Sequence, residues 1–192
     1  MFSQNQEELY ISKYFKDHVG IFLDLGAYDG IKLSNTYNLV LKAWKGVCVE
    51  ASPKVFTMLQ SNLKNYNNIE LLCACVSVDD HKIIDWYDNS EATATYVMSN
   101  VEKWKNETPF TQIKLSTTSV DKILDSFNYD YDFINIDVEG NSVEIFKHIY
   151  NRISNVKMIC VEHDNMINDI SKIAKNHKTF YLNAENIILV IK

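Results

Sequence analysis

Short apolar runs alternate with segments of helical spacing along most of this chain. Five apolar runs have the length and composition of buried strands: residues 20–26, 46–52, 68–78, 131–137 and 156–162. Helical spacing is found over residues 33–44, 53–63, 118–127, 141–153 and 166–177, with Ser52 as cap and Pro53 as first residue of the second of these helices. This alternation predicts a parallel sheet with helices on both faces. Residues 178–183 and 186–192 predict a final antiparallel hairpin at one edge.

A single domain over residues 1–192 fits the length, and a hydrophobic content of 46% is enough for a sizeable core. Residues 79–117 are less regular, with short strands, loops and Pro109, and we expect this insertion to lie on the substrate side of the domain. It carries a group of aromatic residues that includes Trp86, Tyr87, Tyr96 and Trp104. We interpret them as packing residues, with stacking on a sugar as the alternative.

Charge and cysteine usage narrow the class of protein. A net charge of −6 argues against a general nucleic-acid-binding protein. No apolar run is long enough for a membrane span, and the first residues do not resemble a signal peptide. The four cysteines lie in apolar runs without a CxxC pair, which predicts buried free thiols and disfavours zinc or redox chemistry. We therefore expect a soluble, cytoplasmic protein.

Acidic residues recur where the predicted strands end. Acids end four of the five strands: Asp24, Glu50, Asp137 with Glu139, and Glu162 with Asp164 after His163. Parallel sheets bind ligands at the carboxyl ends of their strands, near the point where the strand order reverses. The pattern therefore predicts that the functional site lies at this edge.

The first strand ends in DLGAYDG, residues 24–30. Gly26 and Gly30 would let the backbone pass close to a ligand. Ala27 and Tyr28 break the GxGxxG pattern, which disfavours a dinucleotide pyrophosphate site. Asp24 would also repel a pyrophosphate, but it suits a cationic amino group such as that of S-adenosylmethionine. The alternative is a plain turn with a capping acid.

The second strand ends at Glu50, 24 residues beyond Gly26. A carboxylate at this place accepts hydrogen bonds from the two ribose hydroxyls of an adenosine. Ala51 and Ser52 would then lie beside the adenine. Val76 and Ser77, near the end of the third strand, and Asp137, at the end of the fourth, would complete the cofactor site. The alternative is a solvated Glu near a helix start.

Five motifs occur in one order: DLGAYDG, VEASP followed by NL, TTSVDKIL, INIDVEG and CVEHD. In this order they resemble the FkbM-type S-adenosylmethionine-dependent methyltransferases, over residues 20–165. The resemblance implies a Rossmann-like class I methyltransferase fold, with a mostly parallel seven-stranded sheet and a C-terminal antiparallel hairpin. It also implies O-methylation of a hydroxyl of a sugar, glycan or small metabolite.

The chain departs from the family pattern at four positions. The family usually has Asn where this chain has Tyr28, and Pro where it has Ala51. It often has Lys in place of Asn135 and an acid in place of Ser142. We expect the first two changes to leave cofactor binding intact, and the last two to bear on the substrate and on activity. Two other classes of function therefore stay open: a catalytically silent cofactor- or partner-binding module, and an NAD-dependent oxidoreductase.

The candidate catalytic residues are Asp137, Glu139, Glu162 and His163. Any of them could take the proton of an acceptor hydroxyl, and strand position favours Asp137 and Glu162. Alternatively, Asp137, Glu162 and Asp164 could hold Mg²⁺.

Simpler structural roles are open for several of the same residues. His163 could instead hydrogen-bond the IDVEG loop. Gly140 has the character of a turn residue, and Asn141 or Ser142 could cap the next helix.

Overall fold

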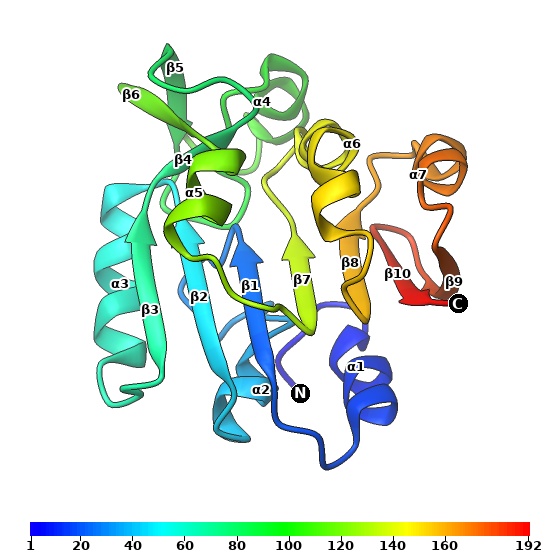
Figure 1. Cartoon of the computed structure of the whole chain (residues 1–192). Helices are drawn as coiled ribbons and strands as arrows, with labels where there is room; N and C mark the ends of the chain where they lie inside the picture. Colours follow the sequence, from blue (N-terminus) through cyan, green and yellow to red (C-terminus); the bar gives the residue numbers. More distant parts are fainter.

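The computed structural model describes residues 1–192 and contains a seven-stranded sheet in the order β3-β2-β1-β7-β8-β10-β9 (Figure 1). Its strands are β1 (Ile21–Leu25), β2 (Lys45–Glu50), β3 (Ile69–Cys73), β7 (Phe133–Ile136), β8 (Met158–Glu162), β9 (His177–Leu182) and β10 (Asn186–Ile191). The first five in spatial order are parallel, and β10 is antiparallel to both β8 and β9. This confirms the predicted sheet with its C-terminal hairpin.

Helices cover both faces of this sheet, as predicted. The helices of one face are α1 (Glu7–Phe15), α2 (Tyr37–Leu41) and α3 (Pro53–Leu63); those of the other are α5 (Val120–Ser126), α6 (Ser142–Ile153) and α7 (Ile167–Ile173). Successive side chains of a strand point to opposite faces. Leu23 thus joins the core under α5 to α7, whereas Phe22 joins the core under α1 to α3.

A second, smaller sheet lies beyond the carboxyl ends of β1, β2 and β7, at the top of Figure 1. It contains β4 (Cys75–Ser77), β6 (Thr111–Ser119) and β5 (Ile83–Asp88), and α4 (Met98–Trp104) lies between β5 and β6 in the chain. The single strand predicted over 68–78 is therefore wrong. It breaks at Ala74, whose N–H donates to the carbonyl of Glu50, and the next residues pair with β6. Residues 79–117 are more regular than predicted.

The helix predicted over 33–44 is also shorter than the apolar spacing suggested. Leu33 has a φ of 55°, which a helix does not allow, and it forms an isolated bridge with Ser3. Ser34 Oγ accepts from the N–H of Tyr37, where α2 begins. At the other end of the chain α7 ends at Ile173, so the helix predicted over 166–177 is too long as well.

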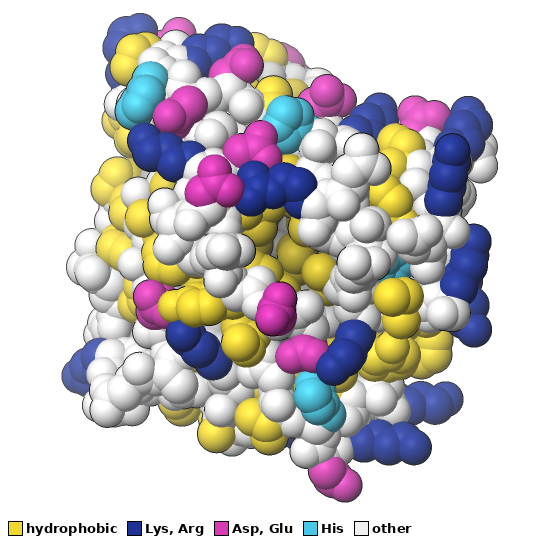
Figure 2. Space-filling model, viewed as in Figure 1, with side chains coloured by type: hydrophobic (Ala, Val, Ile, Leu, Met, Phe, Trp, Pro, Cys, Tyr) yellow, Lys and Arg dark blue, Asp and Glu magenta, His cyan; other side chains and the backbone are white.

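Three of the four cysteines are buried and all four are free thiols, but Cys73 is exposed, contrary to the prediction. No helix combines the length and the apolar character that a membrane crossing requires. Acidic and basic side chains are interspersed over the upper part of the face drawn in Figure 2.

Candidate functional site

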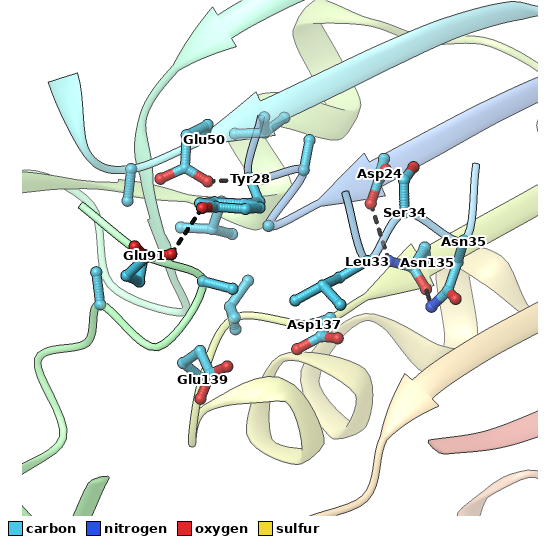
Figure 3. Close-up of a pocket in the computed structure, with 18 of the residues that line it drawn as sticks. Asp24, Tyr28, Leu33, Ser34, Asn35, Glu50, Glu91, Asn135, Asp137 and Glu139 are labelled. Atoms are coloured by element: carbon cyan, nitrogen blue, oxygen red, sulfur yellow. Dashed lines mark hydrogen bonds between the residues drawn. The ribbon is translucent and has the colours of Figure 1, made fainter. Parts of the chain in front are cut away.

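A cavity of about 940 Å³, including its open mouth, lies at the carboxyl ends of the parallel strands and is lined by 25 residues. It contains the acids that end three strands: Asp24 of β1, Glu50 of β2, and Asp137 with Glu139 after β7. Figure 3 shows Asp24 and Glu50 at opposite ends of the cavity, with Asp137 and Glu139 along the side between them. The predicted edge of the sheet therefore carries this cavity.

Gly26 allows the turn after β1 to lie against the end of β7. Its φ is 89°, and a Cβ at this position would lie 1.7 Å from the carbonyl oxygen of Asp137. The N–H of Asp137 donates to the carbonyl of Leu25 at 2.9 Å, which joins the two strand ends. Only glycine fits this arrangement.

Asp24 is buried and held by neutral partners. Its carboxylate accepts from Thr36 Oγ1 at 2.6 Å and from Asn135 Nδ2 at 2.9 Å. Asn135 lies opposite Asp24 on β7 and in turn accepts from Asn35 Nδ2 at 3.1 Å. Burial raises the pKa of Asp24, and the two hydrogen bonds act against that shift. The amide at position 135 thus supports the strand-end acid.

Glu50 is fixed by backbone donors at the other end. One oxygen accepts from the N–H of Tyr28 at 3.0 Å and the other from the N–H of Ser52 at 2.8 Å. Burial raises the pKa of Glu50 to about 7, despite the N–H groups that favour the ionised form. Each carboxylate oxygen has a second acceptor direction, so Glu50 can still accept from a ligand.

An apolar wall stands beside Glu50. Ala51 packs against the buried cluster of Cys75, Trp86 and Ala94, and all four residues line the cavity together with Val76. Trp86 is 5% exposed and packs in this cluster, while it also lines the cavity. An apolar wall next to a carboxylate suits a flat heteroaromatic ring joined to a diol.

The segment between β5 and α4 forms a roof over the cavity. Tyr28, which has a φ of 50°, donates from its hydroxyl to Glu91 of this segment at 2.9 Å. Thr95 Oγ1 donates to the carbonyl of Glu139 at 2.8 Å. The insertion thus contacts both the β1 turn and the β7 loop.

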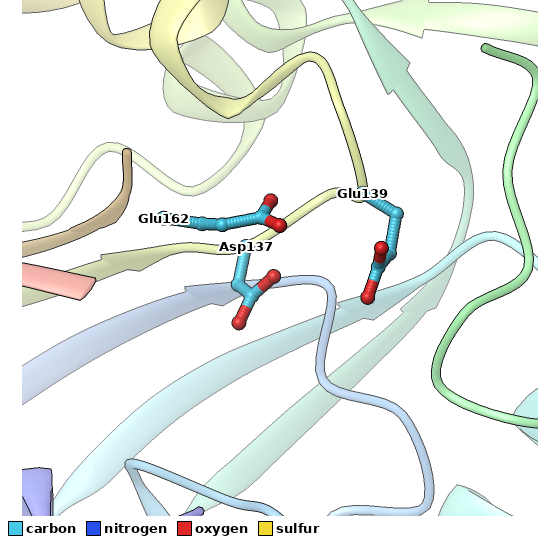
Figure 4. A group of neighbouring side chains, drawn as sticks. All are labelled: Asp137, Glu139 and Glu162. Carbon is cyan, nitrogen blue, oxygen red and sulfur yellow. The ribbon is translucent and has the colours of Figure 1, made fainter. Parts of the chain in front are cut away.

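Asp137, Glu139 and Glu162 form a carboxyl cluster in which one oxygen of each lies within 4.8 Å of the others (Figure 4). Burial raises the pKa of all three, most strongly that of Asp137, and brings that of Glu139 to about 8. Repulsion by Glu162 adds to the shift of Asp137 and of Glu139. Oxygen atoms in this arrangement can share a proton or bind a hard cation.

Ser142 links this cluster to the β7 loop. Its Oγ accepts from the N–H of Val138 at 2.9 Å and donates to Glu162 at 2.9 Å. The interpretation of Asn141 or Ser142 as a helix cap is wrong, because Asn141 makes no capping hydrogen bond and α6 already begins at Ser142.

Several predicted residues lie outside the cavity. His163 donates from Nε2 to the carbonyl of Asn183 and accepts at Nδ1 from the N–H of Asn165, each at 3.1 Å, so it holds the β9–β10 turn rather than the IDVEG loop. Glu162 belongs to the cluster but does not line the cavity, and Glu139 takes the place predicted for Asp164. Three predicted cofactor residues also do not line it: Gly30, Ser52 and Ser77.

These three residues make contacts within the fold. Ser52 caps α3 as predicted, accepting from the N–H of Val55. Gly30 packs against Leu59 of α3, and Ser77 accepts from the N–H of Asp79.

Sequence reasoning missed two charged residues of the cavity, Lys32 and Glu91. Both lie in loops between elements, and no motif or spacing marks them. Their place depends on how the loop after β1 and the insertion fold over the strand ends.

A model of the methyltransferase FkbM domain matches residues 24–181. A search among curated proteins gave no match. Among solved structures, an FkbM methyltransferase from Methylobacillus flagellatus superposes with a TM-score of 0.57 at 15% identity, covering 100% of this chain and 48% of that one. The methyltransferase PaMTH1 from Podospora anserina, bound to S-adenosylhomocysteine, superposes with a TM-score of 0.56 at 13% identity. The superposition covers 100% of this chain and 80% of that one. An O-methyltransferase from Bacillus cereus, also in complex with S-adenosylhomocysteine, superposes with a TM-score of 0.50 at 15% identity. The superposition covers 100% of this chain and 83% of that one.

The structural similarities, all below 25% identity, show a shared Rossmann-like fold. The family match covers most of the chain and includes Asp24, Glu50, Asp137 and Glu162. The chain belongs to the FkbM family of methyltransferases.

Proposed function

We propose that this protein transfers the methyl group of S-adenosylmethionine to a hydroxyl of a sugar, glycan or small metabolite. The observation that carries the proposal is the placement of Asp24 and Glu50 at opposite ends of one cavity, with Asp137 along its side. An adenosine at the Glu50 end would place its ribose hydroxyls against the carboxylate and its adenine against the apolar wall of Ala51 and Trp86. Asp24 would then bind the amino group of the methionine moiety.

Methyl transfer is an in-line displacement, in which the new C–O bond forms as the C–S bond of the sulfonium breaks. The acceptor hydroxyl loses its proton in this step. Asp137 and Glu139 line the cavity at the place between the two cofactor ends, so their carboxylates are the proposed proton acceptors. Burial and repulsion by Glu162, which is bonded to Ser142, raise the pKa of Glu139 to about 8, so the ionised form that can accept the proton becomes populated as pH rises toward 8.

Magnesium is a second candidate for the same cluster. The three carboxylates of Asp137, Glu139 and Glu162 offer oxygen atoms within 4.8 Å of one another, a donor set that suits a hard cation. When bound, Mg²⁺ would lower the pKa of the acceptor hydroxyl. Loss of activity after EDTA treatment, restored by Mg²⁺, is the expected result for this candidate, whereas EDTA-resistant activity would exclude it.

The oxidoreductase alternative has less support, because five carboxyl groups line the cavity and would repel the pyrophosphate of NAD. A cytoplasmic location also belongs to the proposal, supported by four free thiols.

The function is tested by measuring transfer of labelled methyl groups to a panel of neutral sugars and hydroxylated metabolites. We expect transfer by the wild type, loss of transfer in Asp137→Ala, and little change in the affinity of that variant for S-adenosylhomocysteine. Exposed Asp130 supplies the matched control, since Asp130→Ala should keep full activity. Full activity of Asp137→Ala would remove this carboxylate from the mechanism. Cofactor binding without transfer to any acceptor of a broad panel would favour the silent module instead.

A further inference from the structure

Lys32 is the one basic residue in the lining of the cavity, and the other charged residues there are acids. The acids of the lining are Asp24, Glu50, Glu91, Asp137 and Glu139. Lys32 is exposed, and it takes part in none of the protein's salt bridges, which use other lysines. A positive charge that has no protein partner and lies within an acidic lining is available to an anionic group of a ligand.

The backbone of Lys32 is held in place by its own loop. Asp29 Oδ1 accepts from the N–H of Ile31 at 2.9 Å and from the N–H of Lys32 at 2.8 Å. The next residue, Leu33, is bridged to Ser3. These contacts fix the loop before a ligand arrives, which lowers the entropy lost on binding.

The loop lies at the Asp24 end of the cavity. Figure 3 shows Leu33 and Ser34 beside Asp24, whereas Glu50, Tyr28 and Glu91 are at the other end. Asp24 has only neutral hydrogen-bond partners, Thr36 and Asn135, so its charge is not neutralised by the protein. This end of the cavity therefore offers an anion, Asp24, and a cation, Lys32, to a ligand that carries both charges.

We propose that Lys32 binds the carboxylate of the methionine moiety while Asp24 binds its amino group. The inference rests on the proposed function and extends it, because it assigns a residue to the one anionic group of the cofactor. Without Lys32 every charged residue of the lining would be acidic, and repulsion would weaken the binding of that carboxylate. With Lys32 present, each charge of the methionine zwitterion faces an opposite charge of the protein. This orientation places the adenosine at the Glu50 end of the cavity.

Calorimetric titration with three ligands tests this assignment. S-adenosylhomocysteine has both the amine and the carboxylate, its decarboxylated analogue keeps only the amine, and methylthioadenosine has neither. We expect Lys32→Met to weaken S-adenosylhomocysteine by about three- to tenfold, the range between an exposed ion pair and a charge-assisted hydrogen bond. The other two ligands should bind Lys32→Met as they bind the wild type. Lys32→Arg should restore most of the loss, and Lys178→Met, on exposed β9, should change none of the three affinities.

Two results would overturn the assignment: an unchanged affinity of Lys32→Met for S-adenosylhomocysteine, or an equal loss for all three ligands. Neither result contradicts the proposed function as long as the wild type binds methylthioadenosine, because that ligand tests the adenosine site without the amine and the carboxylate. Failure of the wild type to bind any of the three ligands would instead contradict the proposed function, and with it this inference.

Discussion

Gly26 and Asp137 meet where β1 and β7 end, so closely that a Cβ on the glycine would lie 1.7 Å from the carbonyl oxygen of the acid. The two strands are neighbours in the sheet, and their contact places the glycine turn and the catalytic candidate against each other. A change at Gly26 therefore reaches Asp137 through the backbone rather than through a side chain.

Gly26→Ala is expected to destabilise the protein and to displace Asp137. The positive φ costs an alanine about 1–2 kcal/mol, and the clash with the Asp137 carbonyl adds to that cost, for a total above about 2 kcal/mol. Urea unfolding measures the loss of stability, and the rate of methyl transfer measures the displacement of Asp137.

Gly30→Ala is the matched control, because Gly30 also has a positive φ but its Cβ would meet the side chain of Leu59. A smaller loss of stability is expected there. Equal losses for the two variants would show that the contact with Asp137 is unimportant.

Cofactor affinity should rise with pH through the titration of Glu50. Its pKa is raised to about 7 by burial, and the ionised form is the better acceptor for two ribose hydroxyls. We expect S-adenosylhomocysteine to bind more tightly at pH 8 than at pH 6. Glu50→Gln should lose about tenfold in affinity at pH 8 and should lack this dependence.

Calorimetry at several pH values measures this dependence, with Glu107→Gln, at an exposed site, as the control that keeps the wild-type profile. A wild-type affinity that does not change between pH 6 and 8 would contradict the role of Glu50.

Stability should change with pH in the opposite direction because of Glu139. Its pKa in the folded protein is about 8, against 4.5 for an unperturbed glutamate. The folded state therefore binds the proton more tightly than the unfolded chain, and the stability that this provides is lost as pH rises through about 8. We expect the wild type to lose about 1–3 kcal/mol of unfolding free energy between pH 6 and 9, and Glu139→Gln to lose less.

Urea unfolding at both pH values measures this difference. Glu102→Gln, at an exposed position on α4, should follow the wild type. Parallel curves for wild type and Glu139→Gln would mean that Glu139 titrates normally.

The strand ends of the site were predictable because parallel strands share one carboxyl edge. Asp24, Glu50 and Asp137 each follow a clear apolar run, so their meeting at one cavity follows from topology alone. The same argument failed for His163, which also follows a strand. Its ring bonds to the carbonyl of Asn183, a contact 20 residues away that no local pattern reveals.

The misplaced elements have similar causes. Leu33 has the spacing of a helical residue, but its bridge with Ser3 of the N-terminal segment holds it in a conformation with positive φ. The chain leaves the third strand at Ala74 to pair with β6, about 40 residues later. Lys32 and Glu91 reach the cavity only through such loops. Tertiary contacts of this kind override local propensity.

The central claim is that one cavity binds S-adenosylmethionine with its adenosine at Glu50. Calorimetric titration of the purified protein with S-adenosylhomocysteine and, separately, with NAD tests it most directly. The account predicts one-to-one binding of S-adenosylhomocysteine, abolished or strongly weakened in Glu50→Ala, and no binding of NAD. Absence of S-adenosylhomocysteine binding, or binding of NAD in its place, would contradict it.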